Sequence, residues 1–165
     1  MPDVTFEDYT LKIQKAIEDR AIIALEEVAG EIEAQAIKNT PVGKVNGGNT
    51  KGHWEHRVDE ENLEAVIGHH SVIAIYNEFG TGEYALEGNG RKGGWYIPIG
   101  EGENEIPEAV VKAYGFKVVY GKDGKKFAFT TGMEPKRPLF NAFEKKKSKV
   151  KNIIRKRLGG KLEDA

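Results

Sequence analysis

The apolar residues at the start of this chain recur every three or four positions from Phe6 to about Asn39, with no proline in between. That spacing is the period of an α-helix. The run predicts one helix over residues 6–39, which would be about 50 Å long at the usual helical rise. Because a chain of 165 residues folds into a domain narrower than this, we expect the helix to project, to pack on a neighbouring subunit, or to kink near Gly30.

Both ends of the predicted helix carry sequence signals. Asp3 and Thr5 are candidate N-caps, because their side-chain oxygens can accept hydrogen bonds from the first free backbone amides. At the other end Thr40 precedes Pro41, and a residue before proline is pushed out of the helical region. The helix should therefore end at about Asn39.

The rest of the chain alternates short strands, short helices and polar turns. Residues 41–52 and 83–94 have turn chemistry and predict flexible loops, while Asp123-Gly124 is a preferred hairpin turn. The predicted elements are a hairpin of strands 54–58 and 63–68, a short helix ending at Gly80, an edge strand 95–99 with Pro98, a short helix 106–114, a second hairpin around Gly124, and a last helix stopped by Gly159-Gly160. This order predicts an α+β fold in one domain, 1–165.

Composition excludes several classes of protein. The sequence has no cysteine, so disulfides, thiolate zinc sites and cysteine nucleophiles are ruled out. No apolar run approaches the roughly 20 residues that a membrane span requires, and the acidic N-terminus is unlike a signal peptide. We expect a soluble protein that is made in the cytoplasm and has no membrane partner.

Charge is distributed unevenly along the chain. The formal net charge is −1, but residues 1–40 carry −5 and residues 136–161 carry +10. The basic segment can face the acidic first helix, within the subunit or across an interface, or it can lie near DNA phosphates. It has no recognised base-reading motif. The candidate interface or DNA-facing residues are Lys145, Lys146, Lys147, Lys149, Lys151 and Arg155.

No catalytic set emerges from the sequence. The glycine-rich segment 76–98 lacks the spacing of phosphate-binding loops. The histidines His53, His56, His69 and His70 lie on or near the first hairpin, so a metal-dependent hydrolase is one alternative. A strand, however, directs His53 and His56 to opposite faces. We therefore expect no enzyme activity, no cofactor and no metal, and a DNA-binding module is the other alternative.

The order of motifs is similar to that of a known family. A long first helix ends in "TPV" (40–42), a glycine-rich loop and a hairpin follow, then "YNEFGTG" (76–82), and finally "KRPLF" (136–140) before the last helix. This order resembles the minor tail component family of long-tailed bacteriophages, which are tail-completion or head-tail joining proteins. The motif residues are Tyr76, Glu78, Phe79, Gly80, Thr81, Gly82, Arg137, Pro138 and Phe140.

The resemblance implies a structural virion protein rather than an enzyme. Its implied fold is a small curved antiparallel sheet flanked by a long N-terminal helix and a C-terminal helix. Its implied place is a ring of six copies, or a multiple of six, at the phage neck around the DNA channel. The implied partners are a head connector or stopper protein and a tail terminator or tail tube protein, with genomic DNA nearby.

Two further expectations concern the motif itself. Glu78 is a candidate to form an ion pair with Arg137, which Pro138 would hold at the start of the last helix. Segment 83–94 should be an arm that is mobile in the free subunit and ordered against a neighbour in the ring.

Overall fold

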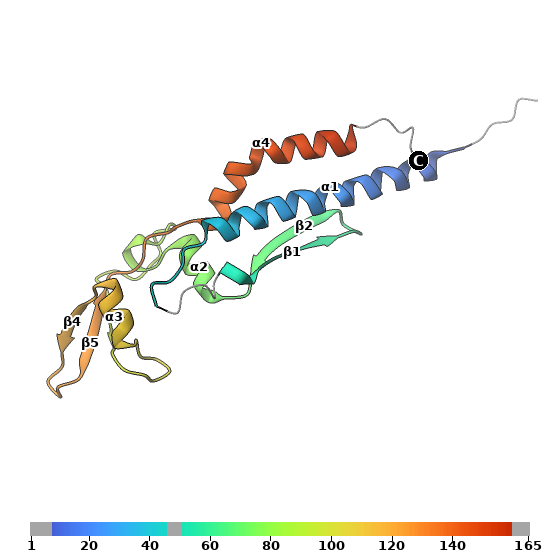
Figure 1. Ribbon diagram of the computed structural model, residues 1–165. Helices are drawn as coiled ribbons and strands as arrows, with labels where there is room; N and C mark the ends of the chain where they lie inside the picture. The colour runs from blue at the N-terminus through green and yellow to red at the C-terminus, as the bar shows by residue number, and fades with distance from the viewer. Residues whose placement is uncertain (1–7, 46–50, 160–165) are drawn as a thin grey trace, which may run out of the picture.

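The longest element is helix α1, Thr10–Asn39, which continues through Gly30 without interruption. The computed structural model describes residues 8–45 and 51–159, so the candidate N-caps Asp3 and Thr5 lie outside the described residues. An Asp8 carboxylate oxygen accepts a hydrogen bond from the Thr10 amide at 2.9 Å, where the helix begins. The helix ends before the extended residue Thr40, as predicted, and Figure 1 shows its N-terminal part projecting beyond the other elements.

A two-stranded hairpin covers one side of α1. Strands β1, Trp54–Asp59, and β2, Glu64–His69, pair antiparallel after a short 3-10 turn, Lys51–His53. The Asp59 carboxylate accepts hydrogen bonds from the amides of Glu61 and Asn62, both at 3.0 Å, and so closes the turn. The predicted hairpin is confirmed.

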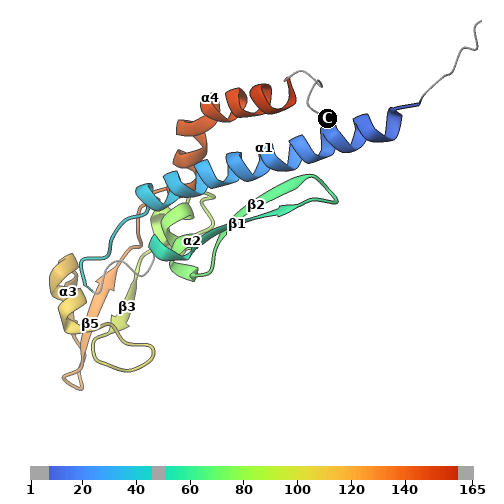
Figure 2. The same cartoon turned by 45° about the vertical axis from the view of Figure 1, so that its right-hand side comes forward.

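The second sheet has three strands and lies at the far end of the molecule from the tip of the hairpin (Figure 2). Its strands are β3, Trp95–Pro98, β4, Lys117–Tyr120, and β5, Lys126–Thr130, in the order β3-β5-β4 with antiparallel pairing. Pro98 thus lies in an edge strand, where no neighbour needs its missing amide. The short helix α3, Glu108–Tyr114, links β3 to β4.

Helix α4, Pro138–Leu158, runs back along α1 and ends at Gly159. The central core joins α1, the first hairpin and α4 through four buried side chains: Ile32, Ala36, Trp54 and Ala142. The Trp54 indole donates a 2.7 Å hydrogen bond to the Thr40 hydroxyl, which donates in turn to the Ala36 carbonyl oxygen at 2.7 Å. This chain satisfies the polar groups that burial of the indole would otherwise leave unpaired.

The predicted α+β class with long N-terminal and C-terminal helices is confirmed, but two details of the expected packing are wrong. The strands form two separate small sheets instead of one. Helix α4 packs mainly on α1 and not on a sheet, because the apolar side chains Leu139 and Val150 complete the core that α1 shares with Trp54. The first hairpin and α4 therefore lie along α1, and the three-stranded sheet lies beyond the C-terminal end of that helix (Figures 1 and 2).

Opposite charges join α1 and α4 within the subunit. Glu31 accepts from Lys149 at 2.6 Å and from Lys146 at 2.9 Å, and Arg157 pairs with Glu27 at 2.8 Å. The hydrogen bonds from Lys149 and Lys146 lower the pKa of Glu31 to about 2. Two of the six candidate interface or DNA-facing residues are thus neutralised by the first helix.

A second charged contact joins α1 to the hairpin. The His56 imidazole lies between Glu33 and Glu26, with 3.1 Å between His56 Nε2 and a Glu26 carboxylate oxygen. The hydrogen bond with Glu33, followed by that with Glu26, raises the pKa of His56 above its usual value. The His56 side chain of β1 thus contacts two carboxylates of α1.

Replacing Gly30 with Ala should stabilise the protein. A methyl group at this position would lie 3.8 Å from the His56 ring, an ordinary contact, and alanine is about 1 kcal/mol better than glycine inside a helix. We expect a gain of about 1 kcal/mol in the free energy of unfolding, measured by chemical denaturation. A loss of stability would show that the contact between α1 and β1 does not tolerate the methyl group.

The Glu31 ion pairs should make stability depend on acid pH. The folded-state pKa of about 2 lies below the ordinary value of 4.5, so the carboxylate stabilises the fold above pH 4.5 and loses this effect as the pH falls toward 2. Glu31→Gln should cost about 1 kcal/mol at pH 7, a modest value because water still reaches the pair. The difference between variant and parent should shrink between pH 4.5 and 2. A difference independent of pH would contradict this assignment.

Candidate assembly site

The motif residues predicted from the sequence meet at one junction, formed by residues 76–83 and residues 131–140. Helix α2, Val72–Phe79, enters it, and Ser71 caps the start of this helix by accepting a hydrogen bond from the Ile73 amide at 3.2 Å. Helix α2 ends at Gly80, whose φ of 73° suits glycine. The chain then makes a 3-10 turn, Gly82–Tyr84.

Glu78 supplies the N-terminal cap of α4. Its two carboxylate oxygens accept hydrogen bonds from the amides of Leu139, at 2.9 Å, and Phe140, at 3.0 Å. Residue Arg137, at the N-cap position, makes no capping hydrogen bond with its own side chain. A carboxylate from α2 thus satisfies two free amides and opposes the positive end of the helix dipole.

The predicted ion pair between Glu78 and Arg137 is wrong. The Glu78 carboxylate is directed to backbone amides, and none of the ion pairs among residues 8–45 and 51–159 joins it to Arg137. Arg137 instead adopts a left-handed backbone with φ 53°, and its guanidinium carbon lies 3.5 Å from the centre of the Phe140 ring. The carboxylate is bound by the backbone amides at the start of α4, and sequence spacing alone does not reveal this.

The glycines and Thr81 of the motif hold two chain segments together at backbone distance. Thr81 donates its amide to the Met133 carbonyl oxygen at 2.9 Å, and the Met133 amide donates to the Thr81 hydroxyl at 3.0 Å. A side chain at Gly80 would come within 2.8 Å of the Tyr84 carbonyl oxygen, and one at Gly82 would strike the Thr131 carbonyl oxygen. Gly80, Thr81 and Gly82 therefore have a structural role inside the subunit.

Segment 83–94 also makes hydrogen bonds within the subunit. The Leu86 amide donates to the Phe79 carbonyl oxygen at 2.9 Å, and the Gly93 amide donates to a Glu83 carboxylate oxygen at 3.1 Å. The Arg91 guanidinium lies 5.8 Å from the Trp95 ring. The segment is thus folded against the junction, and its ordering against a neighbour stays a prediction.

Around this junction, α2 exposes a surface of large apolar side chains that we call the α2 surface. Its residues are Val72, Ile73, Ile75, Tyr76 and Phe79, each about half exposed or more. Only Ala74 and Asn77 of this helix are buried. A helix that is apolar on all sides is normally buried on all sides, so the α2 surface is suited to a protein partner.

Sequence reasoning identified Tyr76 and Phe79 but missed Val72, Ile73 and Ile75. The signal was present in "VIAIYNEF", which is too uniformly apolar for a helix that faces water on one side. The adjacent Phe140 is also partly exposed, at 43%. Pro138, by contrast, is fully buried and serves packing.

The four histidines do not converge on a common centre. His56 faces α1, His70 pairs with Glu55 at 3.0 Å, and the rings of His53 and His69 meet edge to face with centres 6.0 Å apart. Across residues 8–45 and 51–159, no group of three or more His, Asp or Glu side chains is arranged to hold a metal ion. In the same residues, no helix is both long enough and apolar enough to span a bilayer.

Removing the Glu78 carboxylate should loosen the start of α4. We expect Glu78→Ala to cost about 1–2 kcal/mol of unfolding free energy and to accelerate hydrogen exchange at the Leu139 and Phe140 amides. Glu134→Ala is the matched control, because this carboxylate of the same junction is exposed and its described ion pair is a long one, at 3.7 Å from Lys136. Equal exchange rates in the two variants would refute the capping role.

The comparison with known proteins agrees with the motif order. Residues 5–80 match the family model described as "Bacteriophage HK97-gp10, putative tail-component". No curated protein and no solved structure matches the chain. The matched segment contains α1, the first hairpin and α2, and so includes Glu78 and the whole α2 surface. The resemblance to a phage tail-component family is therefore confirmed over residues 5–80, and it supports a structural, tail-related role in the virion.

Proposed function

We propose that this chain is a head-tail joining protein, which forms a ring at the phage neck between the head connector and the tail. The observation that carries the proposal is the α2 surface, where five large apolar side chains lie together on a helix of a tail-component family. Exposure of that much apolar surface is unfavourable in water, so it is suited to burial during assembly.

A ring accounts for the shape of the subunit as well. The exposed N-terminal part of α1 and the α2 surface lie at different places along the molecule, so a copy can present different faces to its two neighbours (Figure 1). Contacts between unlike faces repeat around an axis and close into a ring when the rotation allows. We propose that the whole chain, 1–165, acts as one such unit in six copies or a multiple of six.

The partners in this proposal are a head connector or stopper protein on one side and a tail terminator or tail tube protein on the other. Tyr76, Phe79 and Phe140 are the motif residues available to them, because Glu78, Gly80, Thr81, Gly82 and Pro138 are used within the subunit. The assembly role therefore rests on the aromatic members of the motif.

A DNA-binding module is a weaker candidate. Glu31 pairs with Lys146 and Lys149, and Lys147 has a long contact of 3.5 Å with Glu144. Lys145, Lys151 and Arg155 form no ion pair with a described residue, so they are the positions that genomic DNA could approach in an assembled ring. Three scattered cations favour non-specific proximity over a dedicated DNA site.

Loss of the α2 surface should block joining without unfolding the subunit. We expect Ile73→Lys with Tyr76→Lys to yield filled tailless heads and free tails in electron micrographs, as deletion of the gene should. The control is Tyr120→Lys, an exposed aromatic on β4 in the distant sheet, with circular dichroism to check the fold of each variant. Normal virions from the deletion would overturn the proposed function, and normal virions from the double variant alone would remove the α2 surface from it.

A further inference from the structure

Helix α4 has a face against which none of residues 8–45 and 51–159 packs. Phe143, Lys147, Lys151, Ile154 and Leu158 recur every three or four residues and so share one side of the helix, which we call the outer stripe. All five are exposed, while Ala142 and Ile153, farther round the helix, are buried, and Val150, at the edge of the stripe, is half-buried against the core that α1 shares with Trp54. The outer stripe is apolar at its ends and basic in the middle.

A shallow groove lies on a different side of α1, between its projecting part and the tip of the first hairpin. Its lining is Leu11, Gln14, Lys15, Glu18, Asp19 and Ile22 from α1, with Glu60 and Glu61 from the turn between β1 and β2. Leu11 is 81% exposed, so most of its apolar surface is in contact with water, which is energetically unfavourable. The groove carries four carboxylates and one ammonium group.

Within the part of the chain that the structure describes, the charges of both surfaces lack strong partners. There, Glu18 accepts only from the Gln14 side-chain amide, at 3.0 Å, and no residue forms an ion pair with Asp19, Glu60 or Glu61. Lys151 has no ion pair among the described residues either, and Lys147 has only the 3.5 Å contact with Glu144. This differs from Glu31 and Glu27, which α4 neutralises directly.

The two surfaces match in length and in pattern. Leu11 and Ile22 are eleven residues apart on α1, and Phe143 and Ile154 are eleven residues apart on α4. In a helix this separation is about 16 Å. Between the apolar ends lie Glu18 and Asp19 in the groove and Lys147 and Lys151 in the stripe. One helix laid along the other would bury the apolar ends together and pair the opposite charges.

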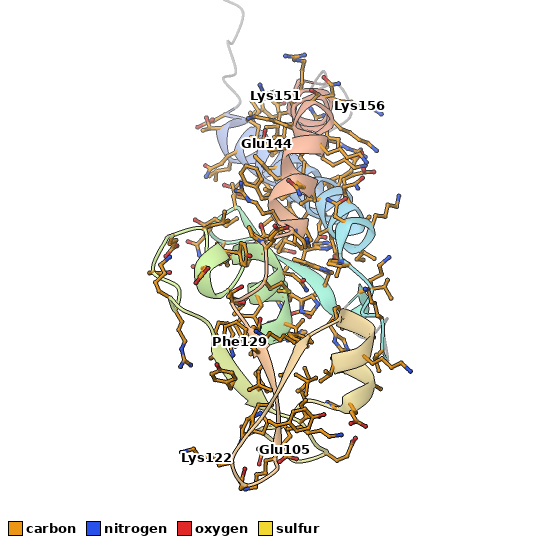
Figure 3. The ribbon with its side chains drawn as sticks, turned by 90° about the vertical axis from the view of Figure 1, so that its left-hand side faces the viewer. Glu105, Lys122, Phe129, Glu144, Lys151 and Lys156 are labelled. Carbon is orange, nitrogen blue, oxygen red and sulfur yellow. The ribbon has the colours of Figure 1, made fainter. Side chains whose placement is uncertain are left out.

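These surfaces do not meet within one chain, because α4 and the first hairpin lie on different sides of α1 (Figures 1 and 2). In Figure 3, which looks along the molecule, Lys151 and Lys156 lie at the end occupied by α4, far from Lys122 in the second hairpin. We propose that the outer stripe of one copy docks in the groove of the next copy. This inference rests on the proposed ring and names the contact between its subunits.

Cross-linking tests the contact directly, because the chain has no cysteine to give a background. Ile22→Cys, in the groove, is mixed with size-tagged Ile154→Cys or Phe143→Cys, so that either orientation of the stripe is sampled. The control replaces Ile22→Cys with Ile23→Cys, an exposed neighbour outside the groove lining. We expect at least tenfold more disulfide-linked heterodimer from one groove pair than from the control. If each of the two groove pairs gave the same yield as its Ile23→Cys control, the proposal would be overturned.

Charge reversal provides a second readout on the same pairs. Glu18→Lys with Asp19→Lys in the groove chain, or Lys147→Glu with Lys151→Glu in the stripe chain, should lower the cross-linked fraction about tenfold. Combining the two reversed chains should restore it, since the charges are again opposite. An unchanged fraction after either reversal would contradict electrostatic docking.

The outcome is separable from that of the proposed function. Subunits that associate in sedimentation experiments but do not cross-link through the groove would form a ring by another contact, so the inference would fail while head-tail joining stands. Efficient cross-linking together with normal virions from the gene deletion would leave the contact established and remove the neck function.

Discussion

The C-terminal half of α1 is the surface on which the rest of the described structure depends. Ile32 and Ala36 are buried there against Trp54 of the first hairpin and Ala142 of α4. The hydrogen-bonded chain from the Trp54 indole through Thr40 to Ala36 allows the large ring to be buried without an unpaired donor. Without this cluster neither the hairpin nor α4 would have a place to bury its apolar side.

From this core, the fold extends by backbone contacts more than by side-chain packing. Glu78 joins α2 to the start of α4. Thr81, in the turn after α2, is hydrogen-bonded to Met133, in the segment before α4. Glycines at 80 and 82 permit the close approach because any side chain would strike a carbonyl oxygen. The geometry of the junction is therefore set by hydrogen bonds, and the large apolar groups of α2 stay exposed.

Charge has two separate uses along α1. Its C-terminal half holds α4 and the hairpin within the subunit through Glu31, Glu27 and Glu33. Its N-terminal half carries Asp19, and the facing turn of the first hairpin carries Glu60; no basic residue of the described chain forms an ion pair with either. An acidic first helix and a basic last helix therefore do not imply a single contact, because ion pairs within the subunit use some of these charges and leave others available for assembly.

The sequence by itself determined the identity and order of the elements, because helical period, prolines, glycines and turn pairs act over a few residues. The order of the motifs that resemble a known family also predicted that Glu78 lies close to the segment around Arg137. Only the tertiary structure decided that Glu78 caps α4 instead of pairing with Arg137, that the strands form two sheets, and that α2 is exposed. These outcomes depend on which groups come within a few ångströms of one another after packing, and the local spacing of residues along the sequence does not specify those distances.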